Sequence, residues 1–506
     1  MSIIVLRREG ALELPFRPGQ TILALLLQQR GAGVEAPCGG KGTCKKCTVY
    51  QVLPEGEREI LACQTWAEDG MVLRLPEQLE LVVELGAQNQ DTVPTEPGKR
   101  GLGIACDIGT TTLVCKLVEL ETGRCLSTVG TANPQRAYGA DVISRIEASR
   151  QGQGKAMTGA LRRALAQMIR RLAERAEVSL GEIQSMSVAA NTTMCHLLVG
   201  LKPDSMGVAP YLPEHTFGCD YDAKALELPF DGAVYVAPAV SGFVGGDITA
   251  GILAAGLEEG GENTLLIDVG TNGELVLGRG DRFVSCATAA GPAFEGAGIR
   301  FGMTASPGAI SEVRWQWGQV KCGVIGGGQA KGICGSGLID AIAVLLEAGA
   351  VDYTGRMLHP DEDEIPEELE PYLYLVDGEP AFCLMDEIAI TQRDVRKLQL
   401  CKGAIAAGIQ ILREKQGEPV ERLLLAGGFG SYIRPESAAK IGLIPRELLA
   451  VTESVGNTAV VGAQMALCSE DARGRLEEIR EHTTYVELSG NPDFQEKYIA
   501  MMYFPR

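Results

Sequence analysis

Short apolar stretches, alternating or continuous, open the chain, and such stretches are typical of β-strands. This pattern predicts strands over residues 2–7, 11–16, 47–52 and 71–76. The apolar stretch ILALLLQQR follows Thr21, so we expect a helix that Thr21 caps and that ends at Gly31. Residues 1–85 are therefore predicted to form a compact mixed α+β domain.

A polar stretch, GAQNQDTVPTEPGKR, follows over residues 86–100. It contains two prolines and has no apolar periodicity, which predicts a flexible linker. Over residues 101–506 the sequence pattern changes and predicts apolar strands, Gly/Thr turns and amphipathic helices such as 156–177. This second part is expected to be an α/β unit.

Two passages in the second part repeat one pattern: an apolar strand, an Asp, a Gly-Thr turn and another apolar strand. They are residues 103–114 (GIACDIGTTTLV) and 264–276 (TLLIDVGTNGELV). The repetition predicts an internal duplication. Two facing lobes are expected, approximately 101–255 and 256–470, with a C-terminal extension over 471–506.

Composition narrows the class of protein. The 506 residues are 45% hydrophobic and 22% charged, as in globular chains of several domains. The formal net charge of −19 argues against nucleic acid and anionic membranes as partners, because both require basic faces. The first ten residues lack a signal-peptide core, and no apolar run reaches the ~18 residues of a membrane span. We therefore expect a cytoplasmic protein.

Four cysteines around a glycine-rich loop follow the spacing C-x5-C-x2-C-x15-C, namely Cys38, Cys44, Cys47 and Cys63. A [2Fe-2S] cluster requires four thiolates, and glycines let backbone N–H groups approach its sulfides. The first gap is one residue longer than the plant-type spacing C-x4-C-x2-C. A structural zinc site is the alternative, because Cys44 and Cys47 suit half of a four-cysteine knuckle.

The two Gly-Thr turns offer backbone N–H groups and hydroxyls that suit phosphate oxygens. The phosphate-binding candidates are Gly109, Thr110, Thr111 and Thr112 in the first turn and Gly270, Thr271 and Asn272 in the second. Asp107 and Asp268 begin the turns and suit Mg²⁺, which keeps most of its waters and takes few carboxylates. Facing lobes would clamp the phosphates of a nucleotide from both sides.

A third glycine-rich element, LAGGFGSY, follows an apolar strand at residues 425–432. Four of its residues are expected to let the backbone lie close to adenine or ribose: Gly427, Gly428, Phe429 and Gly430. The chain contains no G-x4-G-K-[ST] motif and no complete Rossmann fingerprint. Order and spacing therefore favour a nucleotide cleft of another kind.

These three elements resemble the phosphate-1, phosphate-2 and adenosine motifs of the ASKHA superfamily, which unites sugar kinases, acetate kinase, chaperone ATPases and actin. Residues 242–248 and 456–463 look like its two connecting helices. The resemblance covers most of residues 101–467. It implies a duplicated, two-lobed α/β ATPase fold.

With the cysteine loop added, the chain resembles the reductive activators of corrinoid-dependent enzymes. Four further stretches carry the likeness: AGPAFEGAGIRFGM (290–303), GICGSGLIDAIAVL (332–345), EIAITQRDVRKLQLCKGAIAAGI (387–409) and LAGGFGSYI (425–433). The resemblance implies a β-grasp ferredoxin-like domain whose four cysteines hold a [2Fe-2S] cluster. It also implies an ATP- and Mg²⁺-dependent reduction of the Co(II) corrinoid of a partner methyltransferase or corrinoid protein to Co(I). A low-potential electron donor is expected, and a homodimer stays open.

The resemblance further implies roles for individual side chains. Two carboxylates would position hydrated Mg²⁺ and two would orient the attacking water, namely Asp107 and Asp268 for the ion and Glu274 and Glu295 for the water. Asn191 and Asp247 are expected to line the cleft. Two other functions stay open: activation of another low-potential or radical enzyme, and a redox sensor in which the nucleotide acts only as a switch.

Overall fold

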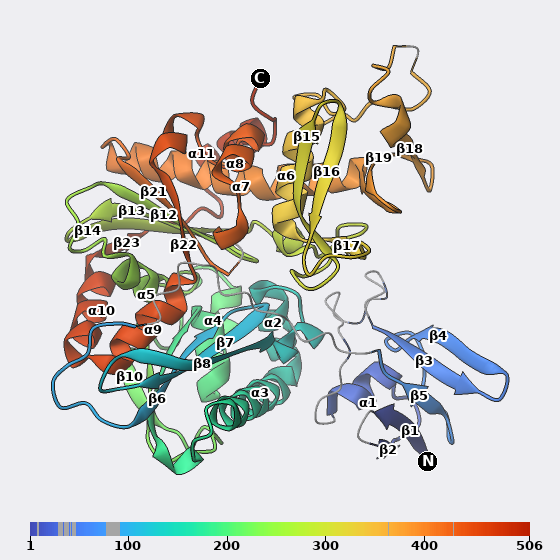
Figure 1. Ribbon diagram of the computed structural model, residues 1–506. Coiled ribbons are helices and arrows are strands. Elements are labelled where there is room, and N and C mark those ends of the chain that lie inside the picture. Colours follow the sequence, from blue (N-terminus) through green and yellow to red (C-terminus); the bar gives the residue numbers. More distant parts are fainter. Residues whose placement is uncertain are drawn as a thin grey trace.

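The N-terminal part of the chain is a five-stranded sheet of order β2-β1-β5-β3-β4 with one helix (Figure 1). The structure is a computed structural model that describes the chain outside residues 8–9, 29–33, 35–39, 41, 43–46, 77–91, 363 and 429. The elements of this part are β1 (Ser2–Arg7), β2 (Gly10–Pro15), α1 (Ile22–Gln28), β3 (Thr48–Leu53), β4 (Gly56–Leu61) and β5 (Val72–Arg74).

Local sequence explains this arrangement. Strand β1 pairs antiparallel with β2 and parallel with β5, as in a β-grasp sheet. Alternation buries Ile3 and Val5 against Ile22 and Leu26 of α1. The Thr21 hydroxyl accepts the Ala24 N–H at 3.2 Å, so the predicted helix cap is confirmed. The predicted end at Gly31 lies outside the described residues.

A six-stranded sheet of order β10-β11-β9-β6-β7-β8 forms the first lobe. Its strands are β6 (Leu102–Ile108), β7 (Thr112–Glu119), β8 (Arg124–Ala132), β9 (Ile183–Ala190), β10 (Cys219–Asp222) and β11 (Ala233–Val236). Its helices are α2 (Val142–Ala148), α3 (Gly154–Arg175) and α4 (Thr192–Val199). Helix α3 matches the predicted 156–177 and buries residues at helical spacing, among them Leu161, Leu165 and Leu172.

The second lobe contains a second six-stranded sheet, of order β22-β21-β12-β13-β14-β23, whose first five strands correspond to β11, β9, β6, β7 and β8. Its strands are β12 (Thr264–Val269), β13 (Gly273–Arg279), β14 (Arg282–Thr288), β21 (Arg422–Ala426), β22 (Thr452–Gly456) and β23 (Thr483–Tyr485). In both lobes three antiparallel strands are extended by two parallel ones: β9 and β11 in the first, β21 and β22 in the second. The predicted internal duplication is confirmed.

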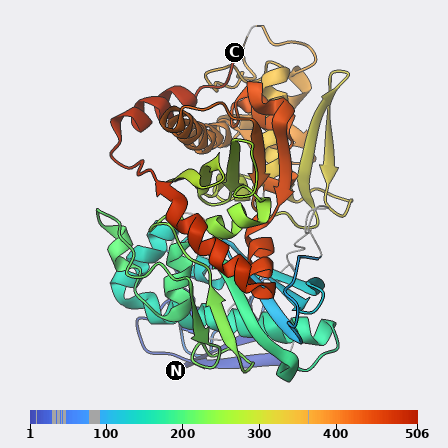
Figure 2. The same ribbon diagram turned by 90° about the vertical axis from the view of Figure 1, so that its left-hand side faces the viewer.

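Two helices lie side by side between the lobes, α5 (Gly246–Ala255) and α9 (Thr458–Cys468) (Figures 1 and 2). They share one apolar core with both sheets, including Ala105 of β6 and Leu266 of β12. A Cβ at Gly462 would clash with the carbonyl oxygen of Ala250, so the glycine sets the close approach of the two helices. Both helices were predicted as connecting helices from residues 242–248 and 456–463.

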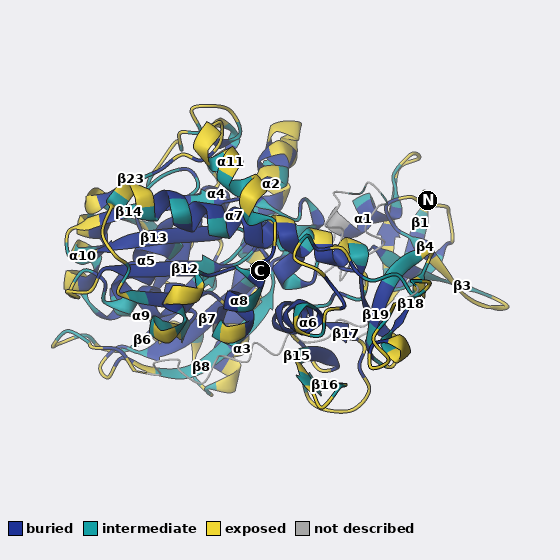
Figure 3. Cartoon of the chain, turned by 90° about the horizontal axis from the view of Figure 1, so that it is seen from above, coloured by how far each residue is buried: buried dark blue, intermediate teal, exposed yellow. Residues whose placement is uncertain are grey.

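The second lobe carries additional elements. They are β15 (Ala309–Gln316), β16 (Gln319–Val324), β17 (Gly332–Ile333), α6 (Gly335–Glu347), β18 (Leu373–Val376), β19 (Glu379–Met385), β20 (Ile388–Thr391), α7 (Gln392–Gln416) and α8 (Pro435–Ile441). The chain ends with α10 (Glu470–His482) and α11 (Pro492–Met501). Figure 3 shows the central strands β12 and β13 buried and much of α10 exposed. Within the described residues, no helix has the length and apolar character that a bilayer crossing requires.

Candidate functional site

The two Gly-Thr turns meet between the lobes. Thr111, just before β7, and Thr271, just before β13, bring their Oγ1 atoms to 2.9 Å. Both hydroxyls also donate to the carboxylate of Glu295, Thr111 to Oε2 at 2.5 Å and Thr271 to Oε1 at 2.8 Å. Glu295 ends a 3-10 helix, Pro292–Glu295. One carboxylate therefore holds the two duplicated turns together.

A cavity of about 270 Å³ opens at this junction. Its walls come from both lobes and from the helices between them. The sequence-predicted residues on these walls are Asp107, Gly109, Thr110, Thr111, Thr112, Asn191, Asp247, Asp268, Gly270, Thr271, Asn272, Glu274, Glu295, Gly427 and Gly428. The duplication thus brings segments from both halves of the chain to one site.

Five carboxylates share the wall of this cavity, namely Asp107, Asp247, Asp268, Glu274 and Glu295. Asp107 is the penultimate residue of β6, beside β7, and Asp268 occupies the matching place in β12, opposite Glu274 of β13. Asp247 lies in the first turn of α5. The protein around them removes water, and this burial raises the pKa of Asp107 to about 7 and that of Asp268 to about 6. Burial and the neighbouring charges of Asp268 and Asp107 raise the pKa of Asp247 to about 8.

The same causes act on the two glutamates. Burial, together with Asp247 and Asp268, raises the pKa of Glu274 well above its usual range. Burial also raises the pKa of Glu295, against the two threonine hydrogen bonds that favour its charged form. A cavity that disfavours so many negative charges suits a divalent cation, because the cation compensates them. The residues present therefore fit hydrated Mg²⁺.

Two asparagines order the first turn. Asn457, the N-cap of α9, donates its side-chain amide to Asp107 Oδ2 at 2.7 Å. Asn191, the N-cap of α4, donates to the Thr110 hydroxyl at 3.0 Å. Each amide oxygen accepts a backbone N–H of its own helix, so both side chains have fixed orientations. Asn457 was not among the predicted site residues, although its stretch was recognised as a connecting helix.

A fully buried arginine supports the first turn from behind. Arg145 of α2 donates to the Thr110 carbonyl at 2.5 Å and to the Gly139 carbonyl at 3.1 Å. Burial, with a contribution from Arg136, lowers its pKa to about 9, so it remains protonated at neutral pH. Asn133 adds a hydrogen bond to the Gly109 carbonyl at 2.8 Å. Both supporting side chains escaped the sequence prediction.

The third glycine-rich element lies against the second turn. A Cβ at Gly427 would come within 2.5 Å of Asp268 Oδ1, whereas a Cβ at Gly428 would meet nothing within 4 Å. Gly427 therefore permits close approach, and Gly428 leaves open space on the cavity wall. Gly430 begins a short 3-10 helix, Gly430–Tyr432, and Tyr432 also lines the cavity. Phe429 lies outside the described residues.

The cysteine loop is described in part. Cys38 and Cys44 lie outside the described residues, whereas Cys47 and Cys63 are buried with their Sγ atoms 3.2 Å apart. The Gln64 side chain donates to Cys63 Sγ at 3.5 Å and to the Gly40 carbonyl at 3.2 Å. Gly40 has a φ of 81°, a conformation that favours glycine. Two adjacent buried thiols with an N–H donor fit thiolate ligands of one metal centre.

Family models cover nearly the whole chain. A model described as the 2Fe-2S iron-sulfur cluster binding domain matches residues 7–68. The RACo middle region matches residues 102–260, and the C-terminal, ASKHA domain of RACo matches residues 262–506. These matches confirm the predicted ferredoxin-type and ASKHA folds. They also favour the iron-sulfur cluster over the zinc alternative.

Individual proteins match over similar lengths. The chain is 32% identical to the corrinoid activation enzyme RamQ of Eubacterium limosum over 570 aligned positions, covering 94% of each chain. It is 26% identical to the [Co(II) methylated amine-specific corrinoid protein] reductase of Methanosarcina barkeri, covering 79% of this chain and 77% of that one. A solved structure titled reductive activator for corrinoid,iron-sulfur protein matches with a TM-score of 0.74 and 29% identity, covering 100% and 98%.

Proposed function

The chain belongs to the family of reductive activators of corrinoid proteins, and on this premise we propose that it restores the Co(I) state of a partner's corrinoid at the expense of ATP. The partner is a corrinoid protein or corrinoid-dependent methyltransferase whose cobalt has become Co(II). The electron comes from the [2Fe-2S] domain, and ATP binds between the two lobes. This function agrees with the names of the relatives in Eubacterium and Methanosarcina.

One observation carries the proposal. A cluster-binding domain precedes a duplicated ATPase whose two phosphate turns meet at Thr111 and Thr271, 2.9 Å apart. A cavity flanked by both turns would bind phosphates from two sides, so nucleotide binding would change how the two turns contact each other. An electron carrier and a nucleotide-dependent contact between lobes in one chain are the parts that an ATP-coupled electron transfer requires.

The residues have the following proposed roles. The backbone and hydroxyls of the two turns bind the phosphates, and the third glycine element binds the adenosine. Asp107 and Asp268 hold Mg²⁺ through its water ligands, and Glu274 and Glu295 orient the attacking water. Because Glu295 bonds both threonine hydroxyls, phosphate oxygens must displace it from them, which leaves its carboxylate beside the bound phosphate.

The cluster is proposed to be held by Cys38, Cys44, Cys47 and Cys63. When bound, a [2Fe-2S] cluster supplies single electrons. The Gln64 amide donates toward Cys63 Sγ, and such N–H donors raise the reduction potential of a thiolate-bound centre. Moving one electron to an acceptor whose reduction potential is ~200 mV lower costs about 4.6 kcal/mol, because ~59 mV corresponds to a factor of ten for a one-electron couple. Burying Cys47 and Cys63 excludes water from this side of the ligand set.

The division of the chain is part of the proposal: a cluster domain over residues 1–85, a linker within 86–100 and an ATPase over 101–506. Electrons enter from a separate low-potential donor, because the cluster must be reduced again after each transfer. A homodimer stays a prediction that sedimentation analysis tests.

The test is reduction of a Co(II) corrinoid protein taken from the same gene neighbourhood. The reconstituted, reduced protein is mixed anaerobically with it, and Co(I) is followed by absorbance with and without MgATP. We expect Co(I) only with MgATP and with the cluster spectrum intact. Equal Co(I) without ATP, or none with any corrinoid partner, would show the proposed function to be wrong.

A further inference from the structure

The described end of the predicted linker is fixed to the ATPase lobes. Val93 is buried, and its N–H donates to the Gly123 carbonyl at 3.1 Å in the β7–β8 turn. The Thr95 hydroxyl donates to the Leu120 carbonyl at 2.6 Å. We call residues 92–99 the anchor segment. Because it directly precedes the first lobe, this segment is where the chain of the N-terminal domain joins the ATPase.

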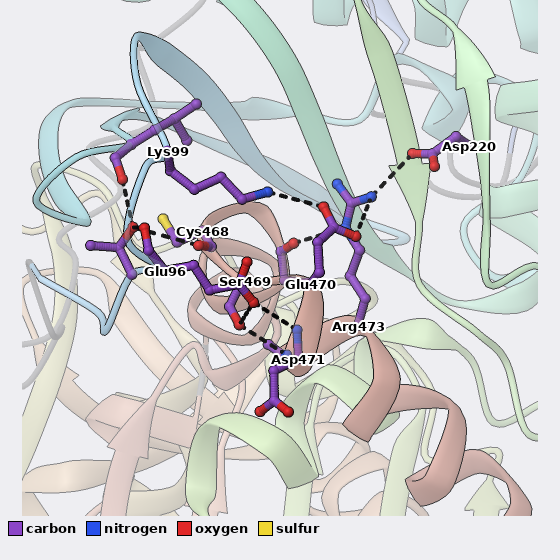
Figure 4. Close-up of polar contacts among 12 residues, drawn as sticks. Glu96, Lys99, Asp220, Cys468, Ser469, Glu470, Asp471 and Arg473 are labelled. Atoms are coloured by element: carbon purple, nitrogen blue, oxygen red, sulfur yellow. Dashed lines mark hydrogen bonds and ion pairs between the residues drawn. The ribbon is translucent and has the colours of Figure 1, made fainter.

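The anchor segment also contacts the junction of α9 and α10 (Figure 4). The N–H of Glu96 donates to the Cys468 carbonyl at 3.1 Å, at the end of α9. One carboxylate oxygen of Glu96, Oε1, accepts the Ser469 hydroxyl at 2.8 Å and the Asp471 N–H at 2.9 Å. Ser469 is the N-cap of α10, so the carboxylate lies at the positive end of a 13-residue helix.

An ion-pair chain extends the contact. Lys99 Nζ lies 3.0 Å from Glu470 Oε1, and Glu470 Oε2 lies 3.4 Å from Arg473 Nη1. Arg473 also lies 3.5 Å from Asp220 Oδ1 of β10 (Figure 4). Exposed pairs of this kind contribute little individually. Together they link the anchor segment to the first turn of α10 and to β10.

Helix α9 meets the anchor segment at its C-terminal end and reaches the cavity between the lobes at its N-terminal end. Asn457 caps α9 and bonds Asp107, while Ser469 ends it at the anchor segment. The helix has 11 residues and is therefore about 16 Å long. Midway, the Gln464 side chain donates to the Gly123 carbonyl at 2.9 Å, the same oxygen that accepts the Val93 N–H. Helix α9 thus contacts the carboxylate of the proposed Mg²⁺ site at one end and the anchor segment at the other.

We propose that Glu96 is a positioning residue that couples the nucleotide state of the cavity to the point where the cluster domain is attached. A change at Asp107 on nucleotide binding displaces α9, because Asn457 follows the carboxylate and the helix moves as a unit. Cys468 and Ser469 then carry Glu96 with them. The proposal rests on the proposed function, since it says how ATP binding in the cavity reaches the point where the cluster domain is attached.

The first test does not involve a corrinoid. Hydrogen exchange of the Glu96 and Val93 amides is measured in the reconstituted full chain, with and without Mg²⁺ and the β,γ-imido analogue of ATP. We expect the exchange rate of the Glu96 amide to change at least threefold when the analogue binds. Unchanged exchange at both amides, with the analogue bound in the cavity, would overturn the proposal.

The second test uses variants. In Glu96→Gln the side-chain oxygen that accepts both hydrogen bonds is retained, whereas Glu96→Ala removes it. Glu121→Ala is the matched control, because Glu121 is an exposed carboxylate near the anchor segment. Its ion pair with Arg100 is 4.0 Å long and does not involve α9 or α10. The readout is ATP hydrolysed per Co(I) formed, which a loss of folded protein alone does not change.

We expect this ratio to rise at least fivefold in Glu96→Ala and to stay within twofold of wild type in Glu96→Gln and Glu121→Ala. The cluster spectrum should be unchanged in all three. A normal ratio in Glu96→Ala would overturn the inference while leaving the proposed function intact. Failure of the wild type to form Co(I) would instead refute the proposed function, and the exchange experiment would still decide the coupling.

Discussion

The hydroxyls of Thr111 and Thr271 lie 2.9 Å apart, although 160 residues separate them in the chain. Each hydroxyl has one proton, and both protons are used in the bonds to Glu295. The two oxygens lie close together because both hydroxyls donate to the same carboxyl group. Glu295 therefore occupies the place between the turns that phosphate oxygens would take in the proposed function, and its carboxyl group joins the two turns.

The hydroxyls should contribute directly to nucleotide binding. Replacing either threonine by valine, Thr111→Val or Thr271→Val, keeps the shape and removes the donor. A hydrogen bond to a charged group contributes about 1.5–3 kcal/mol, so MgATP should bind roughly 10- to 100-fold more weakly by calorimetry. Thr111→Ser keeps a hydroxyl and should stay near wild type. Unchanged affinity in both valine variants would exclude the turns as the phosphate site.

Binding of Mg²⁺ should depend on pH between about 6 and 8. The pKa values of Asp268, Asp107 and Asp247 are raised to about 6, 7 and 8, so Mg²⁺ must displace protons below these values. Their ordinary value is 3.8, so the carboxyls ionise earlier in the unfolded chain. Their contribution to stability is present at low pH and is lost as the pH rises through the raised values.

Mg²⁺ should restore the stability that is lost when these carboxyls ionise. We expect it to raise the thermal unfolding midpoint more at pH 8 than at pH 6, as measured by calorimetry without nucleotide. Equal increments at the two pH values would contradict the assignment of these carboxylates to the ion. The double variant Asp107→Asn with Asp268→Asn should remove the increment at both pH values and leave the cluster spectrum unchanged.

Close packing of α5 on α9 should tolerate no added methyl group at its centre. Gly462→Ala places a Cβ against the Ala250 carbonyl and should reduce the free energy of unfolding by about 1–3 kcal/mol, measured in urea. Gly474→Ala on α10 is the control, because its Cβ meets nothing within 4 Å and alanine favours a helix by about 1 kcal/mol. If both variants were stabilised alike, the two helices would not be in the contact described.

The sequence predicted the parts of the site that are local in the chain and missed those that arise from long-range packing. Asp107 and Asp268 were recognisable because strand, Asp and Gly-Thr turn follow one another directly. Asn457 bonds Asp107 across 350 positions, and no local pattern reports that pairing. Arg145 reads as an ordinary charged residue until the fold buries it behind Thr110.

The linker shows the same limit. A polar, proline-containing stretch has no periodicity, so the sequence gives no sign that Glu96 meets Ser469, 373 positions away. Polar composition describes the surface of the segment and not its hydrogen-bond partners. The cysteine spacing, by contrast, is local in the chain, and the 2Fe-2S domain that it predicts agrees with the family match over residues 7–68.

The central claim is that ATP makes an unfavourable electron transfer proceed, and the most direct measurement is the end-point ratio of Co(I) to Co(II). The protein is reduced, freed of excess reductant and mixed with the Co(II) corrinoid protein at equal concentration. We predict that MgATP raises the final ratio at least 100-fold, equivalent to ~120 mV at ~59 mV per factor of ten. A reaction that MgATP accelerates without changing its final ratio would contradict the account.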